Sequence, residues 1–235
     1  MKQFIRNYGV FLLCFLLCWT ALGIALIMTD KQSFHLLLNR YHAPAADIFF
    51  RYYTLIAEYG IYIATACLLF YKAGDALYLL AAEGVAGGIC QIIKHIAHAP
   101  RPAVVFDIAS NPDALPLVQG MTMRLHNSFP SGHTSTFFVL MFTLLIIYSR
   151  SPLYKNRTRQ TVCQILCFLL ALTGAYSRIY LSQHFATDIF AGGIIGTSVV
   201  GLLYPLSMLL RQRFPHFYDW HIGVPIRRKA PGKSA

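Results

Sequence analysis

Three short polar stretches interrupt an otherwise strongly apolar chain, and they hold residues able to do chemistry. They are KHIAHAPRP at 94–102, NSFPSGHTSTFF at 127–138 and SRIYLSQHFATDIF at 177–190. Ionisable side chains inside or beside a membrane-length apolar segment cost free energy, and they often mark a functional site. A polar stretch of this kind is also typical of a loop between two spans, so the residue types must decide between the two interpretations.

The cations of these stretches suit a phosphoryl group. Lys94, Arg101 and Arg178 supply one ammonium and two guanidinium groups, which match the non-bridging oxygens of a phosphate. Ser131 and Gly132 precede an expected helix, whose free backbone N–H groups add a site for an anion. Glycine at this position permits a close approach.

Two histidines and one carboxylate complete the set. His184 and Asp188 are four residues apart and would share one face of a helix. The carboxylate then holds one ring nitrogen and leaves the other free for nucleophilic attack. His133 is placed to protonate the departing oxygen as a general acid. These roles predict a phosphohistidine intermediate that water hydrolyses, with cations in place of the metal ions that many phosphoryl-transfer sites use.

Each of these residues also has a structural explanation when it is taken alone. A single Arg or Lys beside a membrane commonly anchors a helix at the interface, and a His–Asp pair at this spacing is often a structural hydrogen bond. The joint occurrence favours the catalytic interpretation. The remaining histidines nearby, His95, His98 and His126, are expected to be interfacial or loop residues.

Composition indicates which elements position the polar stretches. Of 235 residues, 56% are hydrophobic and 12% are charged, whereas soluble domains carry about 25% charged residues. A search for apolar windows of about 17–25 residues predicts six transmembrane helices, at roughly 10–28, 49–70, 76–93, 134–148, 161–177 and 189–210. The fourth and fifth are short for a span, so their ends are expected to extend into flanking polar residues. The predicted fold class is an all-α polytopic membrane helical bundle, with residues 1–235 as one domain and the motifs between 94 and 188.

The distribution of basic residues predicts the sidedness of the bundle. Six spans put both termini on one side of the membrane. With a cytoplasmic N-terminus, thirteen of the 20 Lys and Arg residues fall in inside segments, as the positive-inside rule requires, and the three polar stretches fall together outside. The basic tail, 211–235, is expected to be an inner-leaflet anchor and not a nucleic-acid-binding arm, despite the net charge of +11.

The cysteines and glycines suit packed helices. All six cysteines lie in apolar runs, and we predict neither disulfides nor a metal site because no histidine joins them at ligand spacing. Gly84 with Gly88, and Gly192 with Gly196, have the spacing that lets membrane helices approach closely.

Two carboxylates, Glu58 and Glu83, fall inside the second and third predicted spans. A carboxylate inside a membrane is a functional candidate. We expect both to be structural, because neither lies near the basic cluster in the sequence.

The three polar stretches resemble a known three-part signature. Lys94-x6-Arg101-Pro102, Pro130-Ser131-Gly132-His133 and Ser177-Arg178-x5-His184-x3-Asp188 are similar in order and spacing to the motifs of the type 2 phosphatidic acid phosphatase and vanadium haloperoxidase superfamily. The resemblance implies a metal-free acid phosphatase site on a helical bundle. It implies that His184 is the nucleophile, Asp188 its partner and His133 the leaving-group acid. The phosphate ligands that it implies are Lys94, Arg101, Ser131, Gly132 and Arg178.

Membership of the membrane branch is favoured by the six predicted spans, because the haloperoxidases, whose site holds vanadate, are soluble. The resemblance implies a lipid phosphatase of a bacterial inner membrane with its site facing the periplasm. Its substrate would be a phosphate of lipid A, a polyprenyl diphosphate, phosphatidylglycerol phosphate or phosphatidic acid. The loop 103–129 is expected to cover the site, and nothing in it indicates which lipid is bound.

Two other functions remain open from the sequence. A lipid phosphotransferase would use the same site but pass the phosphate to a second lipid, and an anion or lipid transporter would use the cations for binding alone. The expected partners are the lipid substrate and the bilayer. We expect no metal, no cofactor, no nucleic acid and no obligatory protein partner.

Overall fold

The structure is a computed structural model that describes residues 2–223. Within that range the chain forms helices and their connections and no strand, which confirms the predicted all-α class. The α-helices are α1 (Lys2–Met28), α2 (Lys31–Leu38), α3 (Pro44–Tyr53), α4 (Ile61–Leu69), α5 (Ala73–Ala97), α6 (Pro102–Val105), α7 (Gly132–Tyr148), α8 (Arg157–Tyr180), α9 (Ala186–Arg213) and α10 (Pro215–Tyr218).

Five helical segments are long and apolar enough to cross a membrane. They are Gln3–Met28, Pro44–Leu69, Ala73–Val105, Arg157–Tyr180 and Ala186–Arg213. The second of them consists of α3 and α4, which a π-helical turn at Ile56–Gly60 joins. These five correspond to the first, second, third, fifth and sixth spans that the apolar windows predict.

The fourth predicted span, 134–148, is a shorter helix, so the expected count of six is not confirmed. α7 has 17 residues, or about 25 Å at 1.5 Å per residue, whereas the hydrocarbon core of a bilayer is about 30 Å thick. The helix contacts α5, α8 and α9, and most of its residues are buried. Since protein surrounds α7, the thickness of the lipid does not set its length.

Close packing of α9 on α7 depends on the glycine pair at 192 and 196. A Cβ atom added at Gly192 would lie 2.4 Å from the Ser131 carbonyl oxygen, and one at Gly196 would lie 2.4 Å from the Ser135 carbonyl oxygen. No side chain larger than hydrogen fits there, which confirms the expected close approach.

The other glycine pair does not pack in this way. A Cβ atom at Gly84 or at Gly88 would meet nothing within 4 Å, because both residues lie on an exposed face of α5. The expectation of close packing at this pair is wrong. The spacing alone does not distinguish an inward face of a helix from an outward one.

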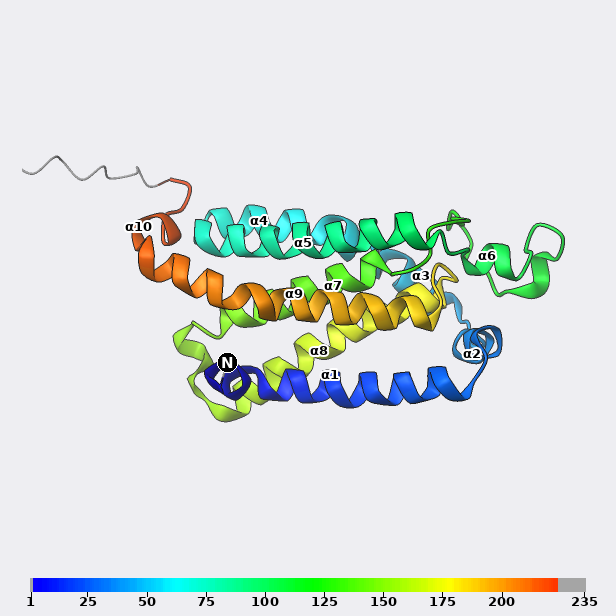
Figure 1. The fold of residues 1–235 in the computed structure, drawn as a ribbon, viewed down its shortest axis with the longest axis horizontal. Coiled ribbons are helices and arrows are strands. Elements are labelled where there is room, and N and C mark those ends of the chain that lie inside the picture. Colours follow the sequence, from blue (N-terminus) through cyan, green and yellow to red (C-terminus); the bar gives the residue numbers. More distant parts are fainter. Residues whose placement is uncertain (1, 224–235) are drawn as a thin grey trace, which may run out of the picture.

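The two ends of the bundle differ in what they carry. Figure 1 shows the start of α1 and helix α10 at one end, together with the link from α7 to α8. α2, α6, the start of α7 and the link from α8 to α9 lie at the other end. All three polar stretches therefore gather at one end, as the span count predicts, and the described part of the chain starts and finishes at the opposite end.

Candidate active site

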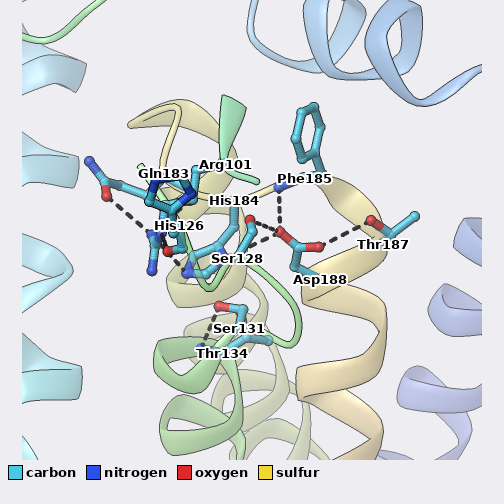
Figure 2. A network of polar contacts seen from close by, with 10 residues as sticks. All are labelled: Arg101, His126, Ser128, Ser131, Thr134, Gln183, His184, Phe185, Thr187 and Asp188. Carbon is cyan, nitrogen blue, oxygen red and sulfur yellow. Dashed lines mark hydrogen bonds and ion pairs between the residues drawn. The ribbon is translucent and has the colours of Figure 1, made fainter. Parts of the chain in front are cut away.

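The imidazole of His184 lies at the centre of a buried polar network (Figure 2). Its Nδ1 is 3.3 Å from Oδ2 of Asp188, and its Nε2 is 3.3 Å from Nη1 of Arg101. His184 is 1% exposed, and Asp188 is fully buried. The structure thus brings together one residue of the first polar stretch and two of the third.

The geometry of the His–Asp pair differs from the expected shared helix face. His184 lies in the link between α8 and α9, before Ala186 begins α9, and Asp188 lies in the first turn of that helix. Oδ2 of Asp188 accepts a hydrogen bond from the Phe185 backbone N–H at 3.0 Å. The carboxylate therefore caps the helix N-terminus, and the same cap holds the imidazole of His184.

Ser128 and Thr187 further fix the carboxylate of Asp188. The Ser128 hydroxyl donates to Oδ2, and the Thr187 hydroxyl lies 3.2 Å from Oδ1. Ser128 is fully buried, so the second polar stretch also reaches this pair. Because Asp188 accepts hydrogen bonds from these donors as a carboxylate, its contact with the ring is best made by a proton on Nδ1 of His184.

Burial keeps the His184 imidazole unprotonated. Removal from water lowers its pKa to about 3, although the hydrogen bond with Asp188 opposes this change, and the nearby Arg101 adds to it. A neutral ring that donates its Nδ1 proton to Asp188 has a lone pair on Nε2. At neutral pH that lone pair faces Nη1 of Arg101.

Arg101 is held by two backbone carbonyl groups. Its Nη1 donates to the Gln183 carbonyl oxygen and its Nε to the His126 carbonyl oxygen, each at 2.9 Å. His126 thus contributes only its main chain to this contact, and its side chain is exposed. Arg101 is 3% exposed, so its guanidinium faces the ring in a fixed orientation.

Arg178 and Lys94 keep hydrogen-bonding capacity unused. Arg178, in the last turn of α8, donates from Nη1 to the Thr54 hydroxyl at 2.6 Å, and its buried Nε has no partner. The ammonium group of Lys94, in the last turn of α5, has no hydrogen-bond or ion-pair partner among residues 2–223. Arg178 is buried and Lys94 is partly buried, and cations with unused donors in such positions are suited to an anionic ligand.

The start of α7 provides two backbone donors rather than the full set expected. Ser131 is the N-cap, its hydroxyl accepts from the Thr134 N–H, and its own N–H donates to the Asp188 carbonyl oxygen at 2.9 Å. The N–H groups of Gly132 and His133 have no acceptor in the described chain. A Cβ atom at Gly132 would meet nothing within 4 Å, so open space adjoins these donors.

His133 contacts a carboxylate that the sequence analysis placed away from the site. Its Nε2 is 3.3 Å from Oε1 of Glu58. The expectation that Glu58 is remote is wrong, because the π-helical turn at Ile56–Gly60 lies against α7. Glu83 instead accepts a hydrogen bond from the Thr136 hydroxyl at 2.7 Å, deeper along α7.

A cavity of about 340 Å³ lies beside the His133–Glu58 pair. His133, Arg178 and Glu58 line it, together with Arg51 and Arg124. Residues 120–122 and Arg124 of the expected covering loop form part of its wall. Gln183 donates to the Thr122 carbonyl oxygen at 3.1 Å. The cavity is therefore a strongly cationic space that is closed on one side by the loop 103–129.

Four residues that contact the predicted site residues do not belong to the sequence motifs. Thr54 holds Arg178, Gln183 holds Arg101, Ser128 holds Asp188 and Glu58 contacts His133. Only Glu58 carried a sequence signal, as a carboxylate inside a span. Residues 2–223 contain no group of three His, Cys, Asp or Glu side chains placed to share a metal ion.

Two known phosphatases are similar to this chain in sequence. The lipid A 4'-phosphatase of Porphyromonas gingivalis is 27% identical over 197 residues, which cover 80% of this chain and 77% of that protein. Lipid phosphate phosphatase 2 of Arabidopsis thaliana is 29% identical over 178 residues, which cover 66% of this chain and 59% of that protein.

Two crystal structures share the fold. LpxE of Aquifex aeolicus superposes with a TM-score of 0.61 at 22% identity, over 74% of this chain and 94% of that one. A transmembrane PAP2-type phosphatidylglycerolphosphate phosphatase of Bacillus subtilis gives a TM-score of 0.61 at 19% identity, over 89% and 99%.

A sequence model of a protein family matches this chain. The model for the PAP2 superfamily matches residues 75–211, which is more than half of the sequence and includes every predicted site residue. With five apolar spanning segments, the protein is a multi-pass membrane protein. The chain belongs to the PAP2 superfamily.

Proposed function

We propose that this membrane phosphatase hydrolyses a phosphate monoester or diphosphate of a lipid headgroup through a phosphohistidine on His184, without a metal ion. The observation that carries the proposal is the buried His184 ring, whose Nδ1 faces Asp188 and whose Nε2 faces Arg101. A carboxylate on one nitrogen and an anion-binding cation at the other is the arrangement that a nucleophilic imidazole requires.

In the first step, Nε2 of His184 attacks phosphorus and the bond from phosphorus to the lipid oxygen breaks. Lys94, Arg101 and Arg178 bind the phosphoryl oxygens, with the N–H groups of Gly132 and His133. Arg101 would exchange its contact with Nε2 for a phosphate oxygen. Asp188 keeps the Nδ1 proton in place and stabilises the positive charge that the ring acquires.

The proton of the first step comes from His133, which gives it to the departing lipid oxygen. Burial, followed by the nearby cations, holds the pKa of His133 well below its usual value. The contact with Glu58 and the negative charge of the bound phosphate oppose this shift and favour the protonated ring that the step needs. In the second step His133 accepts a proton from water, the water oxygen attacks phosphorus and the bond to Nε2 breaks. Inorganic phosphate leaves, and both histidines return to their starting states.

A lipid headgroup is the substrate that the surroundings support. The cavity lies at one end of a membrane bundle, where a headgroup arrives by lateral diffusion. The similar proteins are named for lipid A, lipid phosphate and phosphatidylglycerolphosphate. The candidates are a lipid A phosphate, a polyprenyl diphosphate, phosphatidylglycerol phosphate and phosphatidic acid, with no protein partner needed for turnover.

The orientation in the membrane is part of the proposal. The excess of Lys and Arg in the segments at the end that carries the start of α1 favours cytoplasmic termini and a site that faces the periplasm of a bacterial inner membrane. A cysteine introduced at Gln119, in the loop beside the site, should react with an impermeant maleimide in spheroplasts. Labelling only after lysis would invert the orientation.

The activity is tested by phosphate release from a panel of these lipids in detergent, with EDTA present. His184→Ala and His133→Ala should lose activity on the best substrate, whereas His95→Ala, at an exposed position on α5, should keep it. Wild-type rates in the first two variants would refute the mechanism. Isotope-labelled donor lipid distinguishes the phosphotransferase, because its label would appear in a second lipid rather than in free phosphate.

A further inference from the structure

A second cationic cavity lies at the end of the bundle opposite His184. It has a volume of about 560 Å³ and lies where the start of α1, the end of α7 and the start of α8 meet. Four of its ten lining residues are cations and none is acidic. These cations are Arg6, Arg150, Lys155 and Arg157.

The carboxylates at this end of the bundle are already paired. Asp75 accepts a hydrogen bond from Nη1 of Arg150 and is 1% exposed. Asp219 is 2.6 Å from Nζ of Lys72. One cation of the cavity is therefore neutralised by the protein, and no carboxylate lines the cavity to neutralise the other three.

The remaining three cations have little or no polar contact. Arg6 donates to the Gln3 side-chain oxygen at 2.6 Å, which carries no charge. The side chains of Lys155 and Arg157 have no hydrogen-bond or ion-pair partner in the part of the chain that the structure describes. All three lie at exposed positions. Together they form a cationic surface without a counter-charge from the described chain, which attracts an anion.

Hydrogen bonds between elements hold the walls in place. The Tyr8 hydroxyl of α1 is 2.8 Å from the Ser149 hydroxyl. Gln164 of α8 donates to the Asn7 carbonyl oxygen at 3.2 Å and to the Tyr154 hydroxyl at 3.0 Å. The cavity is thus a formed space and not a loose gap between side chains.

We propose that this cavity binds the phosphate of an anionic lipid headgroup from the leaflet opposite the catalytic site. The chemistry is that of a phosphate group held by guanidinium and ammonium donors. Exposed apolar side chains beside the lining residues, Ile5 and Leu153, are 55% and 58% exposed. They give acyl chains a surface to contact, which favours a lipid over a soluble phosphate.

Lipid binding to detergent-purified full-length protein, measured by native mass spectrometry, tests the proposal. Phosphatidylglycerol is the probe, because its phosphate is a diester with no monoester to hydrolyse, and phosphatidylcholine and inorganic phosphate are the comparison ligands. The wild type should bind phosphatidylglycerol in preference to both. Lys155→Gln/Arg157→Gln should weaken this binding about 25-fold, since each cation near an anionic lipid contributes about fivefold.

The matched control is Arg159→Gln/Arg213→Gln, which removes two exposed cations from the same end but outside the cavity. It should bind phosphatidylglycerol as the wild type does. A third variant, Arg6→Gln, changes a wall on a different helix and should weaken binding about fivefold. Equal binding by the cavity variants and the control would overturn the proposal, as would equal affinity for phosphatidylcholine or for inorganic phosphate.

Discussion

Replacement of Asp188 by Asn tests how the nucleophile is prepared. The carboxylate lies 3.3 Å from Nδ1 of His184, and neither group is more than 1% exposed. At an effective dielectric constant of about 20, a charge on the ring at that distance is stabilised by about 5 kcal/mol. An amide loses this attraction as the ring becomes positive, so the rate of phosphate release should fall about 10³- to 10⁴-fold.

The amide also disturbs the tautomer of the ring. An Asn NH₂ group can donate to Nδ1, which would move the ring proton to Nε2 and remove the lone pair that attacks phosphorus. Both effects act in the same direction, on kcat rather than on phosphate binding. Inhibition by the product phosphate should therefore be nearly unchanged, because Lys94, Arg101 and Arg178 are intact.

The assay is steady-state release of phosphate from the best lipid substrate, with the inhibition constant of inorganic phosphate measured in parallel. Thr187→Val is the matched control, because the Thr187 hydroxyl contacts Oδ1 and not the oxygen that faces the ring. It should lose less than about fivefold. An Asp188→Asn protein that still binds phosphate and retains a tenth of the wild-type rate would refute the assigned role of this pair.

Three other predictions concern the acid, the pH dependence and the helix packing. Glu58→Gln removes the carboxylate beside the general acid. Its kcat near neutral pH should fall about three- to tenfold, in line with about 1 kcal/mol for a partly exposed pair. The control, Glu83→Gln, should keep kcat within about twofold of the wild type. Because burial lowers the pKa of His184 to about 3, the ring remains neutral as the pH falls from 7 to 5, so kcat/KM should show no loss with a midpoint near 6.5; such a loss would contradict a buried neutral nucleophile. Gly196→Ala should lower the unfolding temperature, since its Cβ would lie 2.4 Å from a backbone oxygen of α7, whereas Gly84→Ala, which meets nothing within 4 Å, should leave it unchanged or raise it.

The gathering of the three polar stretches at one end was predictable, because it follows from alternation of spans. Apolar length indicates where each helix crosses, and the order of crossings then places 94–102, 127–138 and 177–190 on the same side. The shortness of α7 was visible in the sequence as a 15-residue window, 134–148. Its burial at the centre was not, because nothing in a single helix reports how its neighbours surround it.

The details of the site depend on contacts between segments that are distant in the sequence. The sequence pattern does not predict which of these segments meet. Glu58 and His133 are 75 positions apart, and a π-helical turn, which has no simple sequence signal, brings Glu58 to α7. The spacing of His184 and Asp188 suggested a helical pair, but the helix begins between them, and a capping interaction produces the same proximity. The spacing therefore predicted the contact between His184 and Asp188 correctly, although the local geometry that produces it is different.

Capture of the phosphorylated enzyme tests the central claim most directly. The protein is mixed with labelled lipid substrate, quenched in alkali within milliseconds and digested, and the phosphopeptides are identified by mass spectrometry. We predict an alkali-stable, acid-labile phosphate on His184 that forms and decays at the rate of turnover and is absent from His184→Ala. Turnover without a phosphorylated histidine at any quench time, or a phosphate carried by another residue, would contradict the account.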